Sequence, residues 1–181
     1  MERATKRKTF KDDINFLEYP NWTVTEREKI KEVTIEKEYG VYKLTTGVDS
    51  LPDRLDKIVL YYLLYTLLKD SQLKSTEIRT TRYKIAKGVF CKTKNVGKSE
   101  YDRIMLSLKR WTAIFIEFEG VFYNGDEYIN QYFHIIDNVV LNKKTKELCI
   151  QFNNQYIKQL KETNYFKLIN FDEYKLYFKR P

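Results

Sequence analysis

Residues 71–110 read SQLKSTEIRTTRYKIAKGVFCKTKNVGKSEYDRIMLSLKR, and their pattern is the basis of the fold prediction. A short β-type run at 77–80 precedes a helix at 81–88. A basic and polar linker follows at 91–98, and a second helix follows at 100–112. The stretch therefore predicts the order strand, helix, basic turn and helix.

Two helices carry start signals. Asp53 is placed to cap a helix that contains the apolar run 58–68, broken only by Thr66. Because this helix is apolar nearly all round, we expect it to be buried on several sides or to present one face to a partner. Ser99 opens the later helix, with Asp102 three residues on as a loose capping box.

The flanking sequence predicts antiparallel strands. Residues 33–38 and 41–46 are two β-type runs that meet at Tyr39 and Gly40, which indicates a hairpin. From Ala113 the apolar period switches to two. The residues expected to share strand faces are Ile114, Ile116 and Phe118 on one strand, Phe133, Ile135, Val139 and Leu141 on one long strand, and Leu148, Ile150 and Phe152 on the returning strand.

Three connecting features complete the prediction. Asn124 and Gly125 form a tight-turn signal, and residues 142–146 form a second turn. Asn153 is placed to cap a last helix at 155–162. The segment 14–24, which contains a proline, is expected to be extended.

The element order predicts an α+β fold, namely a winged helix-turn-helix with an added N-terminal β-hairpin and an antiparallel β wing. A chain of 181 residues is the size of one domain. We expect a flexible basic arm at 1–12 and a winged-helix DNA-binding and dimerisation domain at 13–164. Residues 165–181 are expected to be a C-terminal tail, or the start of a linker to a second winged-helix domain.

The positive charge is concentrated in residues 71–110. This stretch holds eleven Lys or Arg residues against three acids, a net charge of +8 that equals the net charge of the whole chain. A surplus confined to one segment indicates a functional surface, since solubility alone is served by charge spread anywhere. Its natural partner is a polyanion, and double-stranded DNA is the predicted one.

In a winged helix the third helix lies in the major groove and presents its solvent face to the bases and phosphates. We expect Arg103, Ser107 and Arg110 on that face, with Leu106 close to it. The arginines suit bidentate contacts with guanine or phosphate. The predicted DNA-binding residues are Arg82, Lys84, Lys87, Lys92, Lys94, Lys98, Ser99, Arg103, Ser107, Lys109, Arg110, Lys143, Lys144 and Lys146.

Other interpretations of these charges stay open. For any single one of them, an ordinary solvated charge is the simpler interpretation, whereas the unbalanced cluster favours binding. The three lysines at 143–146 are interpreted either as a second phosphate contact or as a soluble turn. The basic residues at 3–11 are interpreted as a disordered terminus or as an arm that enters a minor groove.

Catalytic chemistry finds little support. Relaxase and rolling-circle enzymes need paired histidines, and this chain has one, His134, within a β-type run. Gly88 and Gly97 do not match a phosphate-binding loop. The closest acidic pairs fall in a terminus, a helix start and a turn, where acids are common: Asp12 with Asp13, Asp53 with Asp56, and Asp126 with Glu127. We therefore expect no enzyme activity, no metal and no cofactor.

Cysteine usage and the longest apolar run bear on the compartment. Cys91 and Cys149 have no metal spacing, and the first residues lack the apolar core of a secretory signal. The apolar run 58–68 is too short for a membrane helix, which needs roughly 20 residues. The expectation is a cytoplasmic protein with reduced thiols and no membrane contact.

Three segments resemble a known family. Residues 47–62, which read GVDSLPDRLDKIVLYY, are similar to the entry of the first winged-helix domain of bacterial plasmid replication initiators. Residues 106–111 (LSLKRW) and 132–136 (YFHII) also resemble this family, within which the replication initiator protein A group is the most similar. The similarity spans roughly residues 45–180 and consists of diffuse patterns without an invariant signature.

The resemblance implies a protein that binds repeated origin sequences, helps to open the origin and recruits the host replicative helicase machinery. In related two-domain initiators, the second winged helix makes the main major-groove contacts. The first contributes backbone contacts and a dimer interface. Because this chain ends where a second domain would begin, the resemblance favours dimerisation or auxiliary DNA binding as its own activity, and a homodimer is expected.

Two other functions are carried as alternatives. One is a homodimerising interaction module whose contact face is formed by the helix at 54–69 and by Leu106. The other is a single-stranded DNA-binding protein that stacks bases on its 15 tyrosines. Neither alternative includes origin recognition of its own.

Overall fold

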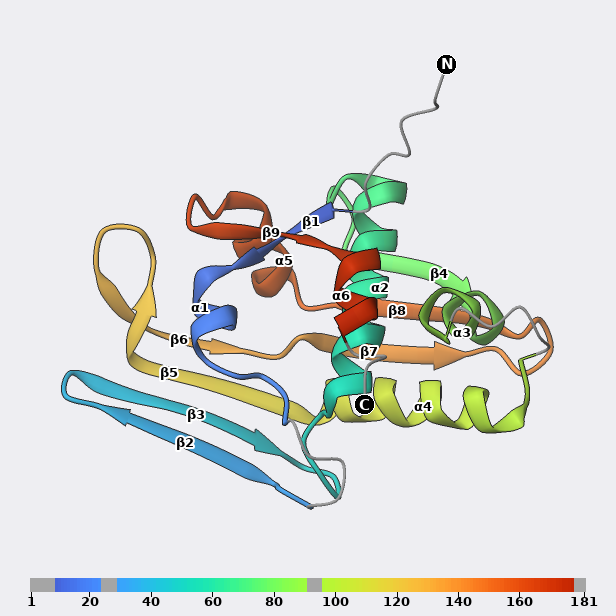
Figure 1. Cartoon of the computed structure of the whole chain (residues 1–181), viewed down its shortest axis with the longest axis horizontal. Helices are drawn as coiled ribbons and strands as arrows, with labels where there is room; N and C mark the ends of the chain where they lie inside the picture. Colours follow the sequence, from blue (N-terminus) through green and yellow to red (C-terminus); the bar gives the residue numbers. More distant parts are fainter. Residues whose placement is uncertain (1–8, 24–28, 91–95, 178–181) are drawn as a thin grey trace.

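The computed structural model describes residues 9–23, 29–90 and 96–177, which form antiparallel sheets flanked by helices (Figure 1). In this part of the chain the protein is mixed α/β with six helices. The elements are β1 (Thr9–Asp13), α1 (Ile14–Glu18), β2 (Glu32–Lys37), β3 (Gly40–Thr46), α2 (Arg54–Ser71), β4 (Glu77–Thr81), α3 (Arg82–Phe90), α4 (Lys98–Ala113), β5 (Ile114–Tyr123), β6 (Tyr128–Phe133), β7 (Ile136–Leu141), β8 (Glu147–Phe152), α5 (Asn154–Glu162), β9 (Phe166–Asn170) and α6 (Phe171–Tyr177).

The long helix α2 begins as the sequence predicts. Asp53 Oδ1 accepts the N–H groups of Leu55 (2.8 Å) and Asp56 (3.0 Å), and Asp56 Oδ2 accepts the Asp53 N–H at 2.9 Å. This capping box satisfies N–H groups that have no partner inside the helix. Nine residues of α2 are buried, which confirms the prediction of burial on several sides. Because α2 packs against β1, α3, α4 and α6, most of its surface is covered by its own chain.

A four-stranded sheet in the order β2-β3-β5-β6 forms one side of the core. The predicted alternation holds along β5, where Ile114, Ile116 and Phe118 are fully buried. The predicted hairpin joins β2 to β3 at Gly40. A Cβ at Gly40 would lie 2.0 Å from the carbonyl oxygen of Glu119, so the close approach of β3 to β5 requires glycine there.

A three-stranded sheet in the order β4-β8-β7 contains the second predicted hairpin. The single long strand predicted over 133–141 is wrong, because the chain leaves the first sheet after Phe133 and enters the second at Ile136. Phe133, Ile135 and Ile136 are all buried, and no single strand with a period of two can bury three such positions on one face. The inward face predicted for β8 and the Asn153 cap of α5 are both confirmed.

The two ends of the described chain meet in a two-stranded antiparallel sheet, β1-β9. The boundary expected between an arm and a domain at residues 12 and 13 therefore falls inside β1. The expected tail also holds α6, whose Phe171 is buried in the core. The extended segment expected over 14–24 begins instead with α1, where Asp13 Oδ1 accepts the Asn15 N–H at 2.8 Å. The pairing of β1 with β9 thus places part of the expected arm and part of the expected tail inside the folded domain.

The described residues contain neither a membrane-spanning helix nor a cluster of metal ligands. No helix in this part of the chain is long and apolar enough to cross a membrane. No group of three or more His, Cys, Asp or Glu side chains there is arranged to hold a metal ion.

Candidate nucleic-acid interface

Three elements gather at the right-hand end of the molecule in Figure 1: α3, the start of α4, and the turn between β7 and β8. Strand pairing produces this arrangement. β4 pairs antiparallel with β8, and its last residue, Thr81, lies opposite Glu147. Arg82 follows Thr81 and Lys146 precedes Glu147, so the start of α3 lies beside the hairpin turn.

The basic residues at this end come from segments about 60 positions apart in the sequence. The group, called the basic end below, consists of Arg82, Lys84, Lys87, Lys98, Lys143, Lys144 and Lys146. All except the half-buried Arg82 are exposed. The acids among the described residues nearest to them in sequence are Glu77, which pairs with Arg79 at 2.7 Å, and Glu100, Asp102 and Glu147. A dense positive surface of this kind suits a polyanion.

Aromatic rings hold two of these cations in place. The Arg82 guanidinium lies 5.2 Å from the centroid of the Tyr101 ring, which joins α3 to α4. The Lys87 ammonium lies 5.2 Å from the Tyr83 ring centroid. A hydrogen bond with Tyr83 raises the pKa of Lys87 above its ordinary value, which already lies far above neutral pH.

The β7–β8 turn presents its lysines on a well-defined backbone. Asn142 Oδ1 accepts the N–H groups of Lys144 (2.9 Å) and Thr145 (3.2 Å), and the Lys146 N–H donates to the Asn142 carbonyl at 2.8 Å. Lys146 has a φ of 61°, in the left-handed region that favours glycine. A lysine therefore occupies a position whose backbone conformation favours glycine.

The solvent face predicted for Arg103 and Arg110 is wrong, because both side chains turn toward α2. Arg103 Nη2 lies 2.6 and 2.7 Å from the two carboxylate oxygens of Asp53, and Arg103 Nη1 donates to Asp56. Arg110 Nη1 lies 2.7 Å from Asp53 Oδ2 and 2.8 Å from Asp56 Oδ2. We call these four side chains the α2–α4 ion cluster. Asp56 is fully buried, and the cluster attaches α4 to the capped end of α2.

Ser107 and Ser99 also differ from their predicted places. Ser107 is fully buried, and its Oγ has no hydrogen-bond partner. Helix α4 is capped at Gly97 rather than Ser99, because the Glu100 carboxylate accepts the Gly97 N–H at 2.9 Å and the Ser99 hydroxyl at 3.1 Å. The helix start that suits a phosphate is therefore occupied by the protein's own carboxylate.

The face of α4 that does reach solvent was missed as a set. It carries Lys98, Ser99, Asp102, Leu106 and Lys109, all exposed. Three-to-four-residue spacing from Lys98 finds this face, whereas the prediction took the side opposite the apolar residues, which carries the two arginines, to be the solvent face. Lys92 and Lys94 lie outside the described residues.

Comparison with known proteins gives a likeness in fold. No model of a known protein family matches the chain, and no curated protein matches its sequence. A crystal structure of a selenomethionine derivative of domains 2 and 3 of RctB, a replication initiator of Vibrio cholerae chromosome II, superposes with a TM-score of 0.58 at 12% identity. It matches 87% of this chain and 64% of that chain.

A second RctB structure of the same two domains has a TM-score of 0.49 at 11% identity and matches 78% of this chain and 57% of that chain. The chain thus spans less than two thirds of the length of each RctB structure. The likeness at 12% identity shows a fold shared with domains of a replication initiator.

Proposed function

We propose that this chain binds double-stranded DNA through the basic end, as a module of a replication initiator and without catalysis of its own. One observation carries the proposal: the pairing of Thr81 with Glu147 places the start of α3, a helix with exposed lysines, beside the lysine-bearing β7–β8 turn. These two groups were predicted separately from the sequence. Their convergence is what a contact with several phosphates of one duplex requires.

The arrangement of elements supports a winged-helix mode of binding. The order α2, β4, α3, α4, β7, β8 and the sheet β4-β8-β7 match that motif, with β5 and β6 inserted after α4. In this proposal the β7–β8 turn is the wing. Its three exposed lysines contact the DNA backbone.

The exposed face of α4 is proposed to lie in the major groove. Lys98 and Lys109, near its two ends, reach phosphates, and Asp102 and Leu106 lie between them. A carboxylate accepts a hydrogen bond from the cytosine amino group, and an apolar side chain contacts the thymine methyl group. Leu106 is an apolar residue with 41% of its surface exposed, and in this proposal it contacts a thymine methyl group.

The shared fold with RctB domains supports a role in DNA replication. Repeated origin DNA is the proposed target, and a plasmid-type initiator is the proposed class. Homodimerisation and recruitment of the replicative helicase machinery are further proposals that follow from the family resemblance.

The direct test measures DNA binding of the full chain by fluorescence anisotropy at several salt concentrations, with duplex and single-stranded ligands. Several phosphate contacts predict a log–log slope of about −3 to −6 on duplex. Replacing Lys143, Lys144 and Lys146 by alanine should make the slope shallower by about 2 to 3. The matched control replaces three exposed lysines of α5 and β9, namely Lys158, Lys161 and Lys167.

The control variant loses the same charge away from the basic end, so its slope should stay near that of the parent. Equal weakening in both variants would mean that only net charge attracts DNA. Tighter binding to single strands than to duplex would favour the stacking alternative instead. Tyr19, Tyr42, Tyr61 and Tyr156 are buried in the core, so in that case the stacking rings would come from the exposed tyrosines, namely Tyr39, Tyr83, Tyr128, Tyr132 and Tyr165.

A further inference from the structure

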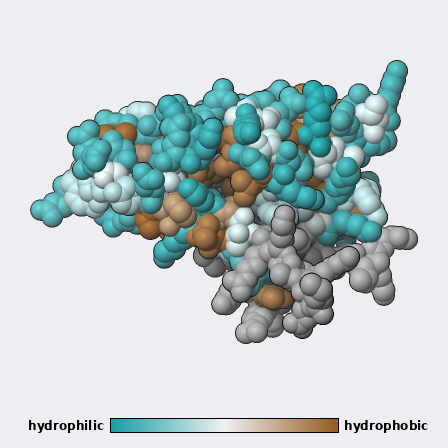
Figure 2. Space-filling model, turned by 90° about the horizontal axis from the view of Figure 1, so that it is seen from above, coloured by the Kyte–Doolittle hydropathy of each residue, from teal (hydrophilic) through white to brown (hydrophobic). Residues whose placement is uncertain are grey.

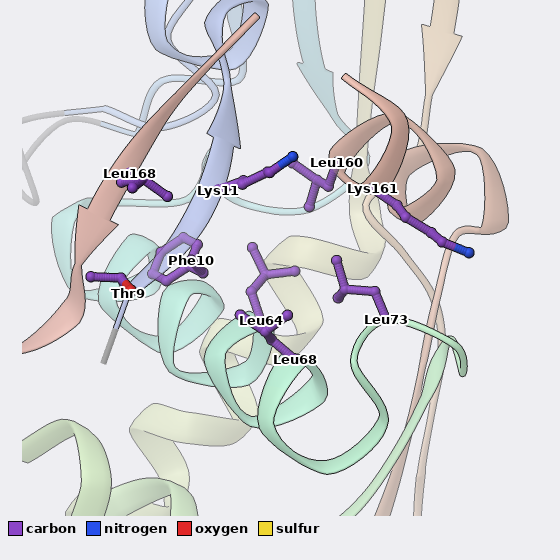
Figure 3. Close-up of a pocket in the computed structure, with 9 residues that line it drawn as sticks. All are labelled: Thr9, Phe10, Lys11, Leu64, Leu68, Leu73, Leu160, Lys161 and Leu168. Carbon is purple, nitrogen blue, oxygen red and sulfur yellow. The ribbon is translucent and has the colours of Figure 1, made fainter. Parts of the chain in front are cut away.

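A pocket of about 240 Å³ opens where α2, β1, α5 and β9 meet, and none of the elements of the basic end lines it. Figure 3 shows its side chains around one space: Leu64 and Leu68 rise from α2, Phe10 and Lys11 come from β1, and Leu168 comes from β9. Thr9, Leu73, Leu160 and Lys161 complete the lining. Figure 2 shows apolar surface near the middle of one face of the molecule, with hydrophilic residues above it and to its left and right.

The wall of this pocket includes a strained residue. After α2 ends, Gln72 and Leu73 have φ values of 53° and 60°, so two consecutive residues other than glycine are left-handed. This conformation is an outlier for a bulky residue such as leucine, and it persists only where the surroundings hold it. The turn keeps the Leu73 side chain in the pocket wall at the expense of backbone strain.

An exposed leucine stands at the opening. Leu168 has 65% of its surface exposed, although it lines the pocket. Single exposed apolar side chains are ordinary, but one that continues a leucine-lined cavity enlarges a contiguous apolar surface. An apolar group that enters the pocket and covers Leu168 would remove the apolar pocket wall and the Leu168 side chain from water.

The charges of the pocket have one sign. Among its nine lining residues the charged ones are Lys11 and Lys161, and none is acidic. The Lys11 ammonium is held 4.1 Å from the centroid of the Phe166 ring, beside Leu168. An apolar pocket with lysines at its border is complementary to an apolar side chain that has carboxylates next to it.

We propose that this pocket binds an acidic amphipathic segment of a protein partner, with a leucine-type side chain inserted among Leu64, Leu68 and Leu73. The pocket offers apolar walls and few polar groups, so a side chain on a peptide backbone fits it better than a small polar ligand does. The acidic residues of the segment would lie against Lys11 and Lys161. This inference stands apart from the proposed DNA contact.

Two other occupants are less complementary. A second copy docked symmetrically would bring the same lysines of both copies together, and like charges oppose such a contact. Residues 1–8, which precede the Thr9 of the pocket, read MERATKRK and carry four basic residues against one acid. The net charge of this segment is therefore positive, like that of Lys11 and Lys161 at the border of the pocket. A negatively charged partner segment would instead be attracted to these lysines.

The test uses the full chain and two synthetic helical peptides with the same leucines at i and i+4. One peptide carries glutamates at its other exposed positions, and the second carries lysines there. Fluorescence anisotropy of the labelled peptides should show at least tenfold tighter binding of the glutamate peptide. Leu168→Ser should weaken that binding about tenfold, because a buried apolar contact is lost.

Matched controls separate a pocket effect from a general one. Leu176 is 60% exposed but does not line the pocket, so Leu176→Ser should change binding less than twofold. Lys161→Glu should weaken binding of the glutamate peptide at least threefold. Lys158→Glu changes an exposed lysine of the same helix outside the pocket and should have a smaller effect.

Three results would overturn the proposal. They are failure of the glutamate peptide to bind more tightly than the lysine peptide, equal losses for Leu168→Ser and Leu176→Ser, and a self-association in sedimentation that Leu168→Ser abolishes. The last result would assign the pocket to a second copy of the chain. Circular dichroism of each variant checks that the substitution has left the fold intact.

Discussion

Arg103 of α4 donates to both carboxylate oxygens of Asp53 at the start of α2, at 2.6 and 2.7 Å. A residue expected to contact guanine or phosphate is thus paired with an acid 50 positions earlier in its own chain. Arg110 and Asp56 complete the ion cluster, and Trp111 Nε1 donates to the Asp56 carbonyl at 2.8 Å. The orientation of α4, and therefore the face it shows to solvent, depends on these contacts.

The ion cluster should contribute to stability. Arg103→Ala leaves Asp53 and the buried Asp56 with one arginine between them, so we expect the free energy of unfolding to fall by about 2–4 kcal/mol. Urea unfolding followed by circular dichroism measures this. Lys109→Ala, an exposed change on the same helix, should stay within about 0.5 kcal/mol of the parent. Equal stability of the two variants would contradict the structural role of the cluster.

Ser107 gives a prediction of the opposite sign. Its hydroxyl is buried without a hydrogen-bond partner, and alanine is the better helix former. Ser107→Ala should therefore raise the free energy of unfolding by about 0.5–1 kcal/mol and leave duplex affinity unchanged. A marked loss of DNA binding in this variant would restore the base-reading role first expected for Ser107.

Lys146 combines backbone strain with charge, and a comparison with Lys143 should separate the two effects. Lys146→Gly relieves the left-handed backbone and should stabilise the fold by about 0.5–1 kcal/mol. It should also make the salt slope of duplex binding shallower by about 1. Lys143→Gly removes the same charge at a residue without positive φ and should not stabilise the protein. Thermal unfolding and salt titration of the two variants provide the comparison.

The buried tyrosines predict a loss of stability in alkali. Burial raises the pKa of Tyr19 to about 12, and it also raises the pKa of Tyr42 above its ordinary value. Above pH 10 the unfolded chain releases these protons while the folded chain retains them. The stability contributed by each tyrosine is therefore full below pH 10 and falls above it by about 1.4 kcal/mol per pH unit.

Substitution of one tyrosine measures its contribution to the loss of stability above pH 10. Tyr42→Phe should make the fall above pH 10 less steep, although it also removes the hydrogen bond from Tyr42 Oη to the Pro20 carbonyl at 2.7 Å. Tyr39→Phe, at a position 55% exposed, should leave the slope near that of the parent. Urea unfolding between pH 9 and 11 tests both expectations, and identical slopes for Tyr42→Phe and the parent would refute the assignment.

The sequence predicted well those features that depend on neighbouring residues. The Asp53 cap of α2, the Asn153 cap of α5, the alternation along β5 and the turn at 142–146 are all present. Caps, turns and side-chain periods are decided within a few residues. The concentration of charge in residues 71–110 was likewise visible, and it pointed toward α3 and the start of α4.

The sequence predicted poorly those features that depend on distant residues. Arg103 and Arg110 were placed outward because they share a polar side of the helix, yet the acids that attract them lie on α2. Asp53 and Asp56 were noted as an acidic pair at a helix start, so the partners were visible while their pairing was not. The terminal strands β1 and β9 were missed for the same reason, since each pairs only with the other end of the described chain.

By itself the sequence determined where most elements begin and end and which segment carries the charge, because local hydrogen bonds and apolar periods set these features. Tertiary structure alone decided that Thr81 lies opposite Glu147, that the two arginines serve α2, and that the leucines of α2, α5 and β9 enclose a pocket. Strand register and burial decide such relationships. They depend on which distant surfaces pack together to remove apolar area from water.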